Sequence, residues 1–175
     1  MIRLIVILIA VLAMTVVILP VGSAQAETCN FNVSSGNWTD GGNWSCGHEP
    51  TFADLAVILS GNTCTMDDAA GEADSLTVES TATLNVQANK KLTLDSSDTN
   101  STIAGTVNLQ GSGSELAFIN NNQTIDGAGK IVGQHSGAQI LLGGGVHLTN
   151  QITIEGALSI NDGNVFDATF INLGT

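Results

Sequence analysis

Hydrophobic residues recur two positions apart along most of this chain, from about residue 76 onward. Residues two apart in an extended strand point to the same face, so each pair predicts a short strand with one buried face. The pairs are Leu76/Val78, Leu84/Val86, Leu92/Leu94, Val107/Leu109, Leu116/Phe118, Ile140/Leu142, Val146/Leu148, Ile152/Ile154 and Leu158/Ile160. Gly, Asn, Asp and Ser separate them and favour tight turns. We therefore predict an all-β fold.

A longer repeat is superimposed on the pairs. Segments of the form apolar, any residue, small, three residues, apolar begin at Val78, Ile103, Ile125 and Ile154. A period in the twenties, built from short strands and turns, is typical of a solenoid. We predict a parallel β-solenoid of about four coils, with about three short strands in each. An antiparallel sandwich is the alternative, but it would normally have longer strands and tight hairpins.

Residues 1–26 have the features of an export signal. Arg3 precedes an apolar run over residues 4–19, and Ala24-Gln-Ala26 supplies small residues for cleavage. The run is shorter than the roughly 20 residues of a membrane span, so an uncleaved anchor is the weaker alternative. We expect a secreted or cell-surface protein whose mature chain begins at Glu27.

The mature chain divides into two parts. We expect residues 27–75 to form an N-terminal cap and the first strands, and residues 76–175 to form the coils. The pattern stops within a coil, as it would in a truncated chain. An unpaired last coil would present a free strand edge, so we expect self-association through it.

The charge of the chain argues against two classes of partner. Without the signal, three lysines stand against sixteen acidic residues, and no arginine remains. Such a chain has almost nothing with which to neutralise phosphates, so we expect no nucleic-acid partner and no membrane partner. The acidic surface is best explained as a source of solubility.

Three cysteines in an exported chain predict one disulfide and one remaining thiol. Three pairings are open to Cys29, Cys46 and Cys64. We favour Cys29 with Cys46, because this bond would tie the start of the mature chain to the segment that holds both tryptophans.

The segment before the repeats resembles a known family. Its residues are Cys29-Asn-Phe, Gly36-Asn-Trp38, Asn43-Trp44-Ser-Cys46, Pro50 and Asp54-Leu-Ala-Val-Ile58. Followed by short strands, they look like the amino-terminal opening of secreted bacterial right-handed parallel β-helix proteins, the pectin-lyase-like and adhesin-like surface proteins. The resemblance implies that fold, which carries lyases, hydrolases and non-catalytic adhesins alike.

The stretch GNWTDGGNWSCGHEP, residues 36–50, is the main candidate site. The first coil of a solenoid has an open end, and Trp38 and Trp44 in a disulfide-tied loop would cover it. The alternative is carbohydrate binding, with the exposed indoles of Trp38 and Trp44 stacked on sugar rings. A cap buries both indoles, whereas a sugar platform exposes at least one face.

Cys46 and His48 raise the question of a nucleophile and its base, or of zinc. Zinc needs three or four converging ligands, and only the scattered Cys64, His135 and His147 remain in the sequence. A catalytic pair needs an orienting third group and an oxyanion donor, neither of which the sequence indicates. We therefore expect no catalytic residue and no metal ligand here.

Carboxylates are the remaining candidates for chemistry. Asp67-Asp68, Asp95 with Asp98, and Asp126 could supply the acid and base of an inverting glycosidase. Acidic residues at turns are more often solvated. The resemblance implies that lyases of this fold use calcium with a basic residue, which a mature chain with three lysines and no arginine is poorly equipped to supply. We expect no cofactor beyond weak structural calcium binding.

Together these observations favour a non-catalytic, exported structural or adhesin-like β-helix module. Its partners would be surface glycans or other cell-surface proteins. The alternatives are a polysaccharide-active enzyme or its remnant, and a carbohydrate-binding module that uses both tryptophans.

Overall fold

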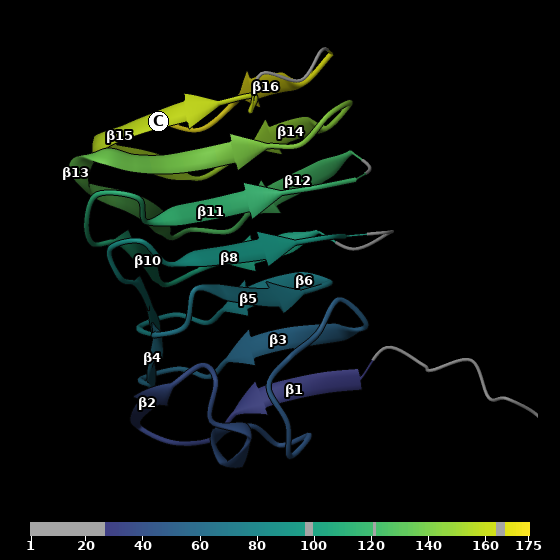
Figure 1. The fold of residues 1–175 in the computed structure, drawn as a ribbon, viewed down its shortest axis with the longest axis vertical. Helices are drawn as coiled ribbons and strands as arrows, with labels where there is room; N and C mark the ends of the chain where they lie inside the picture. The colour runs from purple at the N-terminus through teal and green to yellow at the C-terminus, as the bar shows by residue number, and fades with distance from the viewer. Residues whose placement is uncertain (1–26, 97–99, 121, 164–166) are drawn as a thin grey trace, which may run out of the picture.

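The computed structural model describes residues 27–96, 100–120, 122–163 and 167–175. In them the chain forms a stack of coils whose long axis runs across the strands, with β1 near one end and β16 near the other (Figure 1). The predicted export signal, residues 1–26, lies outside the described residues. Over the described ranges, no helix is long and apolar enough to cross a bilayer.

Short strands account for nearly all the regular structure that is described. A single 3-10 turn, η1 (Gly41–Asn43), accompanies them, and the described residues contain no α-helix. The strands are β1 (Glu27–Phe31), β2 (Ser35–Asn37), β3 (Asp54–Ile58), β4 (Thr63–Met66), β5 (Ala70–Ala73), β6 (Ser75–Val78), β7 (Thr83–Val86), β8 (Lys91–Leu94), β9 (Ser101–Ile103), β10 (Thr106–Leu109), β11 (Glu115–Phe118), β12 (Gln123–Asp126), β13 (Lys130–Leu142), β14 (His147–Asn150), β15 (Thr153–Asn161) and β16 (Thr169–Asn172).

Each strand pairs with the equivalent strand of the next coil, and these strand pairs are parallel. One sheet has the order β1-β3-β6-β9-β12-β14-β16, and the other runs β2-β4-β7-β10-β13-β11-β8-β5, with β15 on β13. The first part of β13 pairs with β10 and its last part with β11, so the second sheet supplies two faces. The predicted parallel β-solenoid is confirmed, and the sandwich alternative is wrong.

The predicted number of coils was too low. The chain makes about six turns rather than four, because two coils precede the repeat that begins near residue 76. Their inward pairs are Cys29/Phe31, Ala56/Ile58 and Cys64/Met66, in which Cys or Ala takes one of the two positions. The hydrophobic pattern that identified the later coils is therefore weaker in a region that has the same backbone path.

Inward side chains stack in columns through the core. In the first sheet, Phe31, Ile58, Val78 and Ile103 are register partners from coil to coil, and all are at most 1% exposed. Fully burying one such side chain contributes about 1.5–3 kcal/mol. The columns therefore fix the register of the coils, because a shift by one residue would turn each inward residue outward.

Glycine is required where the corners of successive coils touch. A Cβ on Gly129 would collide with the carbonyl oxygen of Gly105, and a Cβ on Gly105 would collide with that of Ala82. These three residues lie at the corner between the two sheets, one coil above another. Small residues at this corner leave a recess on the outside of the solenoid.

Candidate functional site

Both tryptophans are buried at the N-terminal end of the stack. Trp38 is 0% exposed and Trp44 is 3% exposed. Trp44 packs edge-on against Phe31 and Trp38, with ring centroids 5.1 Å and 4.9 Å apart. Its Nε1 donates a hydrogen bond of 2.7 Å to the carbonyl oxygen of Trp38. Burial of both rings is what the cap interpretation requires.

This packing argues against the alternative that both tryptophans bind carbohydrate. Stacking on a sugar needs an exposed ring face, and neither Trp38 nor Trp44 presents one. Gly71, on the inward side of β5, makes room for the cap: a Cβ there would collide with the Cε of Met66 and come within 3.0 Å of Trp38 Nε1. The sequence offered no signal for this role of Gly71.

A disulfide fastens the cap to the first strand. Cys29 of β1 and Cys46 are bonded across a sequence separation of 17 residues, with a Cα–Cα distance of 5.1 Å. A loop of this size is worth about 3 kcal/mol in the chain-entropy model. Cys64 is the free cysteine of the described chain; it is buried, and burial raises the pKa of its thiol far above the ordinary range. A thiol in that environment is inert as a nucleophile.

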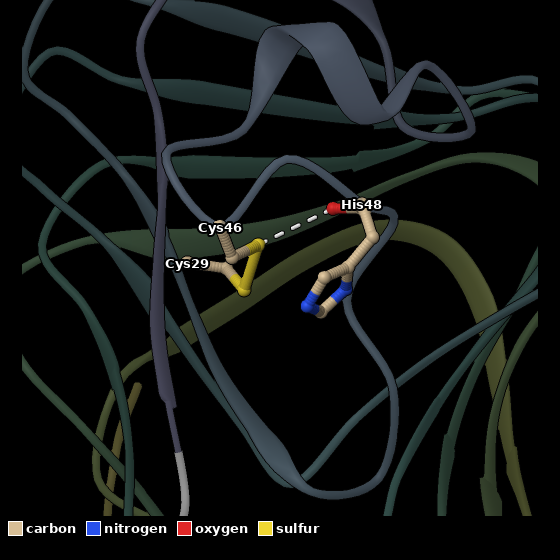
Figure 2. A group of neighbouring side chains, drawn as sticks. All are labelled: Cys29, Cys46 and His48. Carbon is tan, nitrogen blue, oxygen red and sulfur yellow. Dashed lines mark hydrogen bonds between the residues drawn. A yellow bond between two sulfur atoms is a disulfide. The ribbon is translucent and has the colours of Figure 1, made fainter.

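His48 lies beside the disulfide, as Figure 2 shows. The Cys46 Sγ is 3.3 Å from the His48 carbonyl oxygen. Because this sulfur is bonded to Cys29 and carries no hydrogen, the contact is a polar contact and not the arrangement of a nucleophile and its base. Cys29, Cys46 and His48 have ligand-type atoms within 4.8 Å of one another, but the disulfide occupies both sulfurs.

Two carboxylates that the sequence analysis did not associate with His48 approach its ring. The Oε2 of Glu27 is 3.9 Å from Nε2, and the Oδ2 of Asp54 is 4.0 Å from Nδ1. The pKa of His48 is raised, mainly by its hydrogen bond to the Glu49 carbonyl oxygen and further by Asp54 and Glu27. Glu27 and Asp54 are register partners on β1 and β3, a proximity that only the coil-to-coil pairing creates.

The predicted carboxylate candidates are dispersed. Asp67 accepts a hydrogen bond from Thr39, Asp126 from Thr102, and Asp95 from Asn120. These three contacts belong to different coils, and Asp98 lies outside the described residues.

A small acidic pocket lies next to the cap. It has a volume of about 210 Å³ and is lined by Glu49, Pro50, Thr51, Ala70 and Glu72. The pKa of Glu49 is raised, first by burial and then by repulsion from Asp68, Asp67 and Glu72. Glu49 lies near the end of the candidate stretch 36–50, but nothing in the sequence associates it with Glu72.

The outer surface offers a second candidate region, the corner groove. It is a recess of about 310 Å³ that spans four coils, lined by Thr81, Ala82, Thr83, Ala104, Gly105, Thr106, Ala128, Gly129, Lys130 and Thr153. Thr83, Thr106, Lys130 and Thr153 occupy one register column, so their side chains follow one another along the stack. Lys130 donates a hydrogen bond of 2.6 Å to Glu155. The groove therefore presents mainly hydroxyl groups, small side chains and one neutralised cation.

Comparison with known proteins identifies a family but does not indicate a function. No curated protein and no solved structure matches the chain. A family model described as a domain of unknown function, DUF8693, matches residues 30–141, from the first strand and the tryptophan cap into β13. This match spans well over half of the sequence, and the chain therefore belongs to the DUF8693 family.

Proposed function

We propose that this protein is an exported, non-catalytic structural module of the adhesin-like type that acts at the cell surface. One observation carries the proposal: an in-register stack of parallel coils, sealed at its N-terminal end, that holds polar side chains in fixed rows. The backbone ladder spaces these rows by about 4.8 Å and needs no ligand to keep them in place. A rigid rod with a repetitive polar exterior suits a structural or adhesive role.

The disulfide supports the proposed location. Disulfides persist in oxidising environments such as the periplasm, the cell surface and the extracellular space. The Cys29–Cys46 bond closes the cap at the point where the expected mature chain begins. The pectin-lyase-like and adhesin-like proteins that the opening segment resembles are secreted, in agreement with this location.

We propose neutral glycans as the partners of the corner groove. Thr81, Thr83 and Thr106 offer hydroxyl groups that can donate and accept hydrogen bonds with sugar hydroxyls. Lys130 is engaged by Glu155, which leaves little positive charge for an acidic polysaccharide. The overall formal charge of −12 opposes acidic ligands further.

The test combines localisation with binding. A tagged copy of the chain is followed by cell fractionation, and the purified protein is applied to an array of neutral and acidic glycans. Ala128 is exposed and lines the groove, so Ala128→Phe should fill the recess and abolish glycan binding without altering the unfolding midpoint. Ala69→Phe places the same side chain at an exposed position outside the groove, and binding should persist.

Four outcomes would contradict the proposal. Recovery of the tagged protein only in the cytoplasm would overturn export. Binding that Ala128→Phe leaves intact would exclude the groove, and binding to cell-surface proteins but to no glycan would replace the proposed partner. The enzyme alternative is checked on the same glycans, because release of shortened products by the purified protein would displace the non-catalytic role.

A further inference from the structure

Three side chains of metal-ligating type converge on the outer side of the tryptophan cap. Glu27 begins β1, Asp54 begins β3, and His48 lies in the loop between the disulfide and β3. One ligand-type atom from each residue lies within 4.8 Å of the other two. We propose that Glu27, His48 and Asp54 bind one divalent transition-metal ion, with Zn²⁺ as the best chemical match.

The orientation of His48 favours metal binding. Its Nδ1 lies 2.9 Å from the carbonyl oxygen of Glu49, so in the neutral ring this nitrogen carries the proton and donates it. The lone pair is then on Nε2, which is the ring nitrogen nearest Glu27. Histidines that bind metals commonly donate their other N–H group to a backbone carbonyl or a carboxylate, which fixes the tautomer and the ring plane.

The two carboxylates differ in mobility. The carboxylate of Asp54 is 7% exposed, and its Oδ2 lies 4.0 Å from Nδ1, the protonated nitrogen of His48. The same Oδ2 accepts hydrogen bonds of 2.9 Å and 2.7 Å from the backbone N–H and the hydroxyl of Thr51, so Oδ1 is the oxygen that Asp54 would offer to an ion on Nε2. Glu27 is 57% exposed and free to move. If both atoms bound a tetrahedral zinc ion, the carboxylate oxygen of Glu27 would lie about 3.4 Å from His48 Nε2. The present distance between Glu27 Oε2 and His48 Nε2 is 3.9 Å, so the adjustment is short.

Ligand chemistry selects the class of ion. An imidazole nitrogen suits zinc, copper and nickel, whereas calcium and magnesium prefer sets made only of oxygen. The sulfurs of Cys29 and Cys46 are joined, so nitrogen and oxygen atoms are the donors of the oxidised protein. Two carboxylates balance a 2+ charge, and water would complete the coordination. An ion held here would link β1, β3 and the loop of the cap.

The experiment is a titration of the oxidised protein with ZnCl₂, without reductant, followed by calorimetry. We expect one saturable site per chain and a rise in the unfolding midpoint on binding. His48→Gln and Glu27→Gln should each weaken binding by about tenfold or more, on the scale found when the surroundings of a metal site are disturbed. Both positions are exposed, so these variants should unfold like the unsubstituted protein when zinc is absent.

Two controls keep the proposal falsifiable. His147→Gln removes an exposed histidine of β14 and should leave zinc binding unchanged. Glu72→Gln removes a carboxylate from the acidic pocket, where the surface could collect ions non-specifically, and should also leave zinc binding unchanged. Absence of saturable zinc binding, or zinc binding that His48→Gln leaves unchanged, overturns the site, as does binding that is lost in His147→Gln or Glu72→Gln.

Discussion

The two ends of the coil stack are built differently. At the N-terminal end, Trp38, Trp44 and Phe31 fill the space next to the first coil and are almost fully buried. At the other end, Ile160 of β15, Ile171 of β16 and Leu173, just after β16, are 40%, 44% and 67% exposed. Phe170 packs against the core there but is only partly buried.

The contrast shows what a coil needs from its neighbours. An inward side chain within the stack has another coil on either side, so neighbouring coils shield it from water in both directions along the axis. A terminal coil lacks one of these neighbours, and something else must cover its aliphatic groups and backbone edge. The tryptophan cap does this with two large rings, a disulfide and a backbone bridge between Phe31 and Trp44.

The largest effect is expected from removing a ring of the cap. Trp38→Ala should lower the free energy of unfolding by about 3–5 kcal/mol, because it leaves a cavity beside Trp44 among buried residues. Urea unfolding followed by circular dichroism measures the change. Phe170→Ala, at the opposite end, should cost no more than about 2 kcal/mol, since its side chain is only partly removed from water. Equal losses at the two ends would contradict the asymmetry.

Opening the disulfide should produce the next largest loss. A double substitution, Cys29→Ala with Cys46→Ala, frees the cap from β1 and should lower the free energy of unfolding by about 3 kcal/mol. Cys64 remains in this variant. It should stay unreactive toward a thiol reagent in the folded protein, since it is buried and its pKa is raised. Rapid labelling of Cys64 under native conditions would show that the cap has opened the core.

A substitution at Glu49 is expected to change the free energy of unfolding by a smaller amount and in the opposite direction, toward greater stability. Burial and three neighbouring carboxylates raise its pKa above the ordinary value of 4.5, so ionised Glu49 destabilises the fold at neutral pH. Glu49→Gln should therefore stabilise the protein at pH 7, by no more than about 0.5 kcal/mol after solvent screening. The contribution of Glu49 is favourable below its unfolded pKa and is lost as pH rises through the folded pKa. The advantage of the variant should accordingly vanish below pH 4.5, in unfolding curves measured across pH.

The smallest effect on stability is expected at the exposed end. Ile160→Thr combined with Leu173→Thr should change the free energy of unfolding by less than about 0.5 kcal/mol, because both side chains already contact water. The same pair should reduce self-association, which we expect to occur through the edge of this last coil. Sedimentation velocity at increasing concentration distinguishes the two proteins, and identical association in both would place the contact elsewhere.

Much of the fold could be read from the repeats. The pairs Leu84/Val86 and Val107/Leu109 marked strands β7 and β10 because a half-buried strand has a period of two. The first two coils gave a weaker signal, since Cys29, Ala56 and Cys64 occupy inward positions where later coils have Leu, Ile or Val. The estimate of about four coils was low for this reason.

The candidate sites were less predictable from the sequence. The burial of Trp38 and Trp44 could be anticipated, because an open solenoid end requires a cover. The grouping of Glu27, His48 and Asp54 could not, since their distances depend on the register of β1 against β3 and on the path of the intervening loop. The corner groove likewise depends on four separate corners that stack with matching small residues.

The sequence of short segments was enough to specify strands, corners and a narrow aliphatic interior, because these features follow from a side-chain period of two and from turn residues. The tertiary structure alone decided how many coils stack, which outward residues share a column and which charged groups meet at the cap. Those relations join residues about 20 or more positions apart, and they are set by coil-to-coil hydrogen bonding, which no short segment of the sequence encodes.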